Sequence, residues 1–347
     1  MGGGVSSSPG ILTKNKRSGW SVAALLAAFL AVVLLSFCFG RYRVGPFTVV
    51  KALASHFLPI ARTWDPTVDT VVWQVRFPRI LAASLVGACL AVGGAVFQGL
   101  FHNPLVSPYA LGVSSGASLG AAVAILLGAA PIIIETSAFA SGALAVTLTW
   151  LVAQSSRDRS QTTLVLAGIV VGSLFASLVS GTQYIADPNT KLPQIVFWIM
   201  GSLASVQWTD IFRAALIAVP CMMVLVLLRW KINILSMGDE EAAALGEDPR
   251  VMRFVLVAVT TLMTASTVSL AGVIGWVGLV VPHIARNLFG PDYRRLLPAS
   301  IILGALYMLI IDDLARTITM AEIPLGILTG IVGAPVFALL LRRNWKR

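Results

Sequence analysis

The stretch that decides the fold of this 347-residue chain is RFPRILAASLVGACLAVGGAVFQGLFHNPLVSPYALGVSSGASLG, residues 76–120. Residues 80–101 form an apolar run without a charged side chain, and a second such run covers 109–130. Each run is long enough to cross the roughly 30 Å hydrocarbon core of a bilayer, which takes about 20 helical residues. Pro104 and Pro108 lie between the runs, where they stop a helix. The stretch therefore predicts two membrane helices separated by a short break.

The rest of the chain repeats this pattern. Further apolar runs of membrane length lie at 20–39, 131–153, 164–186, 211–228, 251–271, 273–289, 296–315 and 323–341. Only 12% of the residues are charged and the mean hydropathy is +0.87, whereas about 25% charged residues is usual in soluble proteins. Because backbone polar groups must be satisfied internally in lipid, runs of this length must be helices. We predict an all-α membrane protein with ten transmembrane helices in one domain, 19–343.

The positions of lysine and arginine predict the orientation. With the N-terminus in the cytoplasm, only nine of the 25 basic residues fall in outer segments: Arg41, Arg43, Lys51, Arg62, Arg76, Arg79, Lys191, Arg213 and Arg316. This satisfies the positive-inside rule with both termini cytoplasmic. The net charge of +10 then reflects membrane topology, and we expect no nucleic-acid partner. Residues 1–18 are predicted to be a disordered cytoplasmic lead, and 344–347 a cytoplasmic tail.

Small and ionisable residues inside the spans have simple structural interpretations. Glycines recur every four residues at Gly112, Gly116 and Gly120, which favours close helix packing over a substrate role. Asp312 and Arg316 have the i,i+4 spacing of a helical ion pair, and Asp313 shows no obvious partner.

The scarcity of such groups limits the possible functions. An ion-coupled secondary transporter needs titratable groups near the midplane, so that class is the less favoured alternative. The chain lacks the G-x-x-x-x-G-K-[ST] phosphate loop and shows no nucleophile–base pair, carboxylate pair or metal-ligand set. We therefore expect no enzyme activity, no catalytic residues, no metal and no bound cofactor. The energy for transport is expected to come from a separate ATPase.

Residues 238–249, GDEEAAALGEDP, hold five of the chain's 15 acidic residues. Ser236 is expected to cap a short helix there, with acidic residues at its positive end and Gly246 and Pro249 ending it. About ten residues at 1.5 Å each give roughly 15 Å, half the bilayer core, so this helix cannot span. It is predicted to dock on a partner, the alternative being a solvated connector.

Several motifs together resemble the FecCD-type permeases, the membrane subunits of ABC importers for iron–siderophores, haem and cobalamin. They are RFPR at 76–79, the stretch 87–120, LVLAG at 164–168, FWIMGSL at 197–203, GLVVPHIAR at 278–286, and DDLART with EIPLGILTGIVGAPVFALLL at 312–341. The resemblance runs in collinear order over about residues 70–343. It implies ten transmembrane helices per subunit and the type II ABC importer permease fold.

The resemblance also implies partners and cargo. The permease would be a homodimer in the inner membrane of a bacterium or archaeon, in contact with membrane lipid. Two ATPase subunits, which use ATP and Mg, would bind on the cytoplasmic side, and a periplasmic or lipid-anchored binding protein would dock outside. Ferric siderophore is the commonest cargo in the family. Haem, cobalamin and molybdate or tungstate are the alternatives.

Residue roles follow from the same resemblance. The segment 236–248 corresponds to the coupling helix that the ATPase holds, with Ser236, Asp239, Glu240, Glu241, Ala243, Leu245 and Gly246. The basic residues that pair with glutamates of the binding protein correspond to Arg76, Arg79 and Arg316. One cytoplasmic gate corresponds to Asn103 and Leu105, and the other to Gln161 and Thr162, where the sequence departs from the family's serine/threonine pattern.

Overall fold

The computed structural model describes residues 14–344 except 41, 57, 60 and 157–159. Every regular element among these residues is a helix. The helices are α1 (Lys14–Cys38), α2 (Pro46–Ala54), α3 (Pro66–Thr70), η1 (Val71–Arg76), α4 (Phe77–Leu100), η2 (Pro108–Leu111), α5 (Val113–Leu126), α6 (Pro131–Ser155), α7 (Gln161–Ile185), α8 (Lys191–Met200), α9 (Trp208–Leu227), α10 (Arg229–Leu235), α11 (Asp239–Ala244), α12 (Pro249–Ala271), α13 (Val277–Phe289), α14 (Tyr293–Thr317) and α15 (Leu325–Asn344).

The predicted membrane helices are present. Six helical segments of the described chain are long and apolar enough to cross a membrane: Pro66–Leu100, Pro131–Ser155, Gln161–Ile185, Trp208–Leu227, Pro249–Ala271 and Tyr293–Thr317. Four shorter apolar helices are Val22–Cys38, Val113–Leu126, Val277–Phe289 and Leu325–Leu340. Each of the ten lies within or over one predicted apolar run, so the predicted all-α membrane architecture is confirmed.

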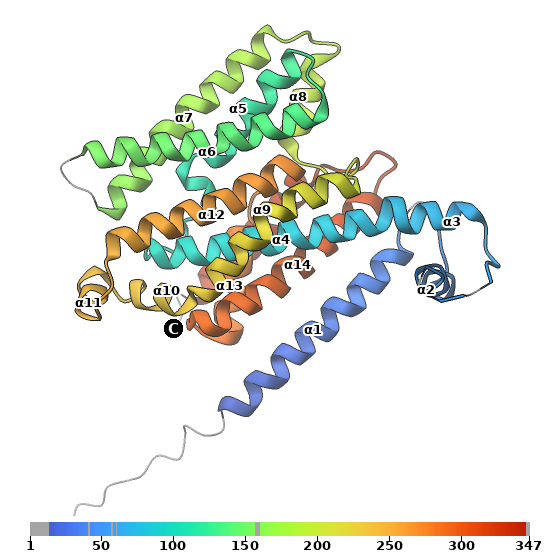
Figure 1. The fold of residues 1–347 in the computed structure, drawn as a ribbon, viewed down its shortest axis with the longest axis horizontal. Coiled ribbons are helices and arrows are strands. Elements are labelled where there is room, and N and C mark those ends of the chain that lie inside the picture. The colour runs from blue at the N-terminus through green and yellow to red at the C-terminus, as the bar shows by residue number, and fades with distance from the viewer. Residues whose placement is uncertain (1–13, 41, 57, 60, 157–159, 345–347) are drawn as a thin grey trace, which may run out of the picture.

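Helix α4 forms the centre of the molecule and packs against α9, α12, α13 and α14 (Figure 1). Its small residues allow this close packing. A Cβ atom added at Gly87 would lie 2.1 Å from the carbonyl oxygen of Gly304 in α14. One added at Gly94 would lie 1.9 Å from the carbonyl oxygen of Gly278 in α13. The backbones of three helices are therefore nearly in contact, as small-residue motifs permit in membranes.

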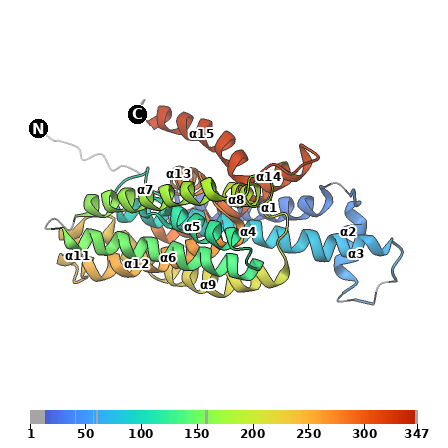
Figure 2. The same cartoon turned by 90° about the horizontal axis from the view of Figure 1, so that it is seen from above.

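Helices α5, α6 and α7 form a second group beside this centre, and α15 lies at the edge of the molecule (Figures 1 and 2). The packing role predicted for the glycine repeat is confirmed at two of its three positions. Gly116 and Gly120 face the backbone carbonyls of Ser141 and Ser137 in α6. Gly112 instead precedes α5 with a φ of 85°, a left-handed conformation that favours glycine.

The chain's two ends differ in part from the prediction. Helix α1 begins at Lys14, so residues 14–18 are helical and do not belong to a disordered lead. Residues 1–13 lie outside the described residues. Helix α15 continues to Asn344, and the remaining tail residues 345–347 also lie outside them.

Candidate functional site

The predicted coupling segment, 236–248, contains one short helix, α11, at one end of the molecule, here called the α11 end (left in Figure 1). The expected helix is present but shorter than predicted, because it begins only after Gly238, whose φ is 138° and which separates it from α10. Ser236 does not cap α11, contrary to the prediction. It ends α10, and its hydroxyl donates to the carbonyl of Asn233 at 2.7 Å. Helix α11 itself spans only Asp239–Ala244.

The surface of α11 is split between a packed face and a free face. Ala242 is fully buried, whereas Glu240, Glu241, Ala243 and Leu245 are exposed, the leucine at 60%. The three acidic residues Asp239, Glu240 and Glu241 occupy the first turn, where negative charge is favourable. Gly246 follows with a φ of 83° and ends the helix. The exposed Leu245 beside the exposed carboxylates of Glu240 and Glu241 is suited to contact with another protein.

Ion pairs and hydrogen bonds hold this segment to the membrane helices. Arg253 of α12 lies 2.6 Å from Asp239, and Lys231 of α10 lies 3.0 Å from Glu247. On the other side, Asn233 of α10 donates to Asp292 at 2.7 Å. The backbone N–H of Arg294 and the Asn233 amide lower the pKa of Asp292, which thus stays ionised at neutral pH. The segment is therefore fixed to α12 and to the start of α14.

The two predicted gates meet at the same end. Helix α4 ends before the loop that holds Asn103 and Leu105, and the Asn103 side chain accepts from the Leu105 N–H at 2.9 Å. Leu105 is 56% exposed. Gln161 is the first residue of α7 and lies 3.1 Å from the ring of His102, next to Asn103, while Thr162 is exposed. The structure thus brings Gln161 beside the first gate, although their roles as gates stay predictions.

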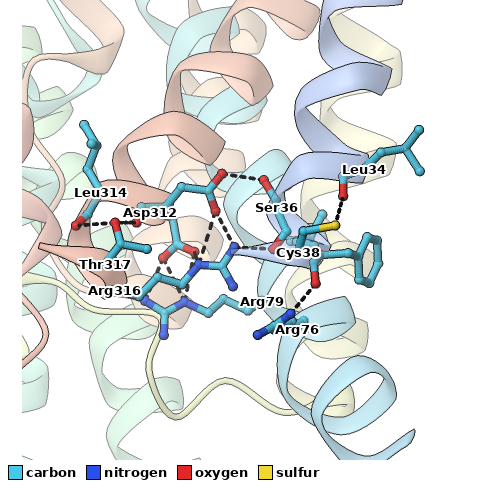
Figure 3. A network of polar contacts seen from close by, with 12 residues as sticks. Leu34, Ser36, Cys38, Arg76, Arg79, Asp312, Leu314, Arg316 and Thr317 are labelled. Carbon is cyan, nitrogen blue, oxygen red and sulfur yellow. Dashed lines mark hydrogen bonds and ion pairs between the residues drawn. The ribbon is translucent and has the colours of Figure 1, made fainter. Parts of the chain in front are cut away.

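The three predicted docking arginines lie at the opposite end, in a polar network that joins α1, α4 and α14 (Figure 3). They are buried: Arg76, Arg79 and Arg316 are 3%, 5% and 6% exposed. Arg79 pairs with Asp312 at 2.8 Å and with Glu322 at 2.8 Å. These arginines have partners within the chain, so a role in docking stays a prediction that must account for their burial.

The rest of the network corrects one expectation. Asp313 does have partners, because it pairs with Arg316 and accepts a hydrogen bond from Ser36 of α1 at 2.6 Å. The predicted Asp312–Arg316 pair is present but long, at 3.8 Å. Arg76 donates to the carbonyls of Phe37 and Tyr42. The network therefore fixes the end of α1 against α4 and α14.

Sequence reasoning missed the partnership of Arg79 with Asp312, which are 233 residues apart. A partner for Arg79 could have been expected, because a charged residue inside an apolar span needs a partner of opposite charge. Sequence reasoning also missed the cluster of Glu135, Asp210 and Arg213. In that cluster Arg213 lies 2.8 Å from Glu135 of α6 and 2.7 Å from Asp210. Within the described ranges, no group of three or more His, Cys, Asp or Glu side chains could hold a metal ion.

A model of the FecCD transport family matches residues 28–343. The chain belongs to this family. The FecCD chain is 39% identical over 322 residues to the molybdate import permease MolB of Haemophilus influenzae, with 91% of this chain and 93% of MolB covered. It is 37% identical to an iron chelatin permease of Helicobacter pylori, with 92% and 97% covered.

A solved structure agrees with this family at the level of the fold. It is described as an inward-facing conformation of a protein assigned to the metal-chelate type of ABC transporter. The FecCD chain matches it with a TM-score of 0.84 and 37% identity, covering 94% of this chain and 99% of the other. The chain thus has the type II ABC importer permease fold and is a permease subunit of an ABC importer.

Proposed function

We propose that the chain moves a bulky metal chelate from a binding protein into the cytoplasm by ATP-driven alternating access. The observation that carries the proposal is α11, whose free face bears Glu240, Glu241 and Leu245 at the end of the molecule where both predicted gates lie. A surface of this kind can transmit movement from a partner to the gates. The α11 end is then cytoplasmic, as are both termini, in agreement with the positive-inside distribution.

A second copy of the chain is part of the proposal. Helix α7 carries a stripe of apolar side chains that are 48–64% exposed: Leu166, Ile169, Val170, Leu174 and Leu178. Their spacing places them on one helix face. In a homodimer that face would lie at the pathway or against the partner copy. The same proposal places two ATPases, which use ATP and Mg, at the α11 end and the binding protein at the opposite end.

The cargo has two candidate classes. Ferric siderophore, haem and cobalamin are metal chelates, and relatives named as iron chelatin, hemin and vitamin B12 permeases support this class. Molybdate is an oxyanion, and the 39% identity to MolB supports it as the second candidate. The relatives differ little in identity, so the choice rests on the binding protein, which delivers the cargo.

Reconstitution into proteoliposomes tests the proposal. The chain would be combined with its ATPase and binding protein, and uptake of a radiolabelled ferric siderophore, haem, cobalamin or molybdate measured. We expect uptake of one probe that requires ATP on the α11 side and all three proteins. Uptake by the chain alone under a proton or sodium gradient, without nucleotide, would instead establish a secondary transporter.

A further inference from the structure

Four side chains and one backbone carbonyl connect the coupling segment to the gate loop. They are Asp239, Arg253, Gln161, His102 and the backbone carbonyl of Leu235, here called the relay. The relay begins on α11 and ends on α10, so both of its ends lie on the turn between these helices. Its middle members come from α12, from the first residue of α7 and from the loop that follows α4.

Arg253 is the fixed point of the relay. It is 7% exposed and lies in α12, one of the membrane helices. Its Nη2 atom lies 2.6 Å from Asp239 Oδ1. When the Gln161 amide is turned so that its oxygen faces Arg253, which satisfies both ends of the amide, that oxygen accepts from the same Nη2 atom at 3.0 Å. One guanidinium nitrogen with two hydrogens can serve both acceptors, so α11 and α7 share a single buried donor.

The Gln161 amide and the His102 ring then have one consistent arrangement. With its oxygen toward Arg253, the amide nitrogen of Gln161 donates to His102 Nδ1 at 3.1 Å and to the Leu100 carbonyl at 3.3 Å. His102 Nε2 lies 3.1 Å from the carbonyl of Leu235 and must donate to it. A neutral imidazole protonated on Nε2 meets both requirements. The carbonyl it satisfies is one of those left free at the end of α10.

The backbone of His102 supports a fixed position for this ring. Its φ is 48°, in the left-handed region that residues other than glycine rarely adopt. Such a conformation persists where the surroundings determine it, and here the surroundings include both ring contacts. His102 directly precedes Asn103 and lies three residues before Leu105, so its position affects the direction of the gate loop.

We propose that His102 and Gln161 are positioning residues that transmit movement of the α10–α11 turn to the gate loop and to the start of α7. This inference rests on the proposed function, because it assumes that a partner displaces the turn. Displacement would move Leu235 and Asp239 together while Arg253 stays with α12. The His102 ring, bonded to Leu235 at one nitrogen and to Gln161 at the other, would carry that movement into the gate.

The test needs a readout that does not depend on the cargo. In the full complex with its ATPase, Leu105→Cys reports the gate through its rate of labelling by a maleimide. The rate is compared between the nucleotide-free complex and the complex trapped with ATP and vanadate. The same chain without Leu105→Cys measures labelling of Cys38, Cys89 and Cys221. We expect the trapped and free rates to differ by about fivefold or more, the lower end of typical allosteric couplings.

Two substitutions at position 102 then break the relay. His102→Gly accepts the same φ and removes both ring contacts, and His102→Asn tolerates that φ but is too short to reach Leu235. We expect both variants to keep ATPase assembly and to lose most of the nucleotide-dependent change in labelling. Gln161→Leu should lose it as well. Ser155→Ala removes a hydrogen bond within α6 at the same end and should keep the full change.

The outcomes separate the two proposals. If the complex without relay substitutions shows no change in labelling, ATP-driven gating itself is wrong. If that complex does show the nucleotide-dependent change in labelling, and His102→Gly, His102→Asn and Gln161→Leu all show the same full change, the relay is wrong. Combining His102→Gly with Gln161→Leu should add little to either single change, since residues of one chain of contacts are not additive. An additive loss would mean that the two residues act independently, which would also overturn the relay.

Discussion

Arg79 and Asp312 form a buried ion pair between α4 and α14, in which the Arg79 Nε lies 2.9 Å from both carboxylate oxygens of Asp312. Their side chains are 6% and 1% exposed. Nη2 also lies 2.8 Å from Asp312, and Nη1 contacts Glu322, beyond the end of α14. One cation is thus enclosed by two carboxylates, and three parts of the chain that are distant in sequence meet at one point.

The first prediction is that loss of the Asp312 charge destabilises the fold. Asp312→Asn would leave the buried Arg79 with only Glu322, and breaking a buried ion pair costs about 3–5 kcal/mol. Thermal unfolding of the purified chain in detergent should show a clear drop. Glu322→Gln is the matched control, because its partner is the same and its side chain is 27% exposed. It should cost about 1 kcal/mol or less. Equal effects of the two changes would contradict the prediction.

The second prediction concerns the close approach of α4 and α13. In Gly94→Ala, the new Cβ would lie 1.9 Å from the carbonyl oxygen of Gly278, which cannot rotate away. The helices must separate, and overpacking of this kind costs about 1–3 kcal/mol or more. Gly181→Ala is the control, since no atom lies within 4 Å of its added Cβ. It should be neutral or stabilising by up to about 1 kcal/mol, because alanine favours a helix. Unfolding in detergent distinguishes the two, and equal stability would exclude the predicted contact.

The apolar runs were enough to predict the membrane helices, because burial of backbone polar groups in lipid permits few alternatives. Local breaks were harder to place. The sequence around Gly238 reads as one capped helix when Ser236 is taken as the cap. In the structure Ser236 instead ends α10, and α11 begins only after Gly238. Asp239, the first residue of α11, pairs with Arg253 on another helix, and the local sequence does not contain that contact.

The sequence identified the site residues by their positions, but it did not predict which residues contact them. The spacing of Asp312 and Arg316 indicated a pair within one helix, yet the shorter contacts of Asp312 are with Arg79 on α4. Similarly, nothing in the sequence places His102 beside Gln161. Contacts between residues that are distant in sequence follow from how the helices pack, and the hydrophobic pattern of single segments does not contain that information.

The third prediction tests the coupling surface. Leu245→Asp together with Glu240→Lys changes the polarity and the charge of the exposed face of α11 while leaving the buried Ala242 in place. We expect the ATPase to stop co-purifying and ATP-driven uptake to be lost. Leu58→Asp is the control for ATPase co-purification, because Leu58 is similarly exposed but follows α2, and α2 lies far from α11 (Figure 1). Unchanged co-purification and uptake in the double variant would show that α11 does not couple.

The last prediction separates docking from folding at the outer arginines. Arg76→Glu with Arg79→Glu is expected to abolish stimulation of ATPase activity by the binding protein, but the internal contacts of both residues would be lost as well. Arg76→Lys and Arg76→Met are better matched. Neither can donate to the Phe37 and Tyr42 carbonyls as the guanidinium fork does, so both should lower the unfolding temperature in detergent.

Only the lysine variant retains the positive charge that would attract a glutamate of the binding protein. If Arg76 acts in docking through its charge, Arg76→Lys keeps most of the stimulation and Arg76→Met loses it, mainly through a slower association rate that depends on salt. Stimulation that falls equally in both variants, in proportion to their stability, would mean that Arg76 serves the fold alone. The comparison is necessary because the Arg76 side chain is only 3% exposed. A buried charge can attract a glutamate of the binding protein only if the outer segment around Tyr42 moves away, or if the electric field of the charge extends through that segment.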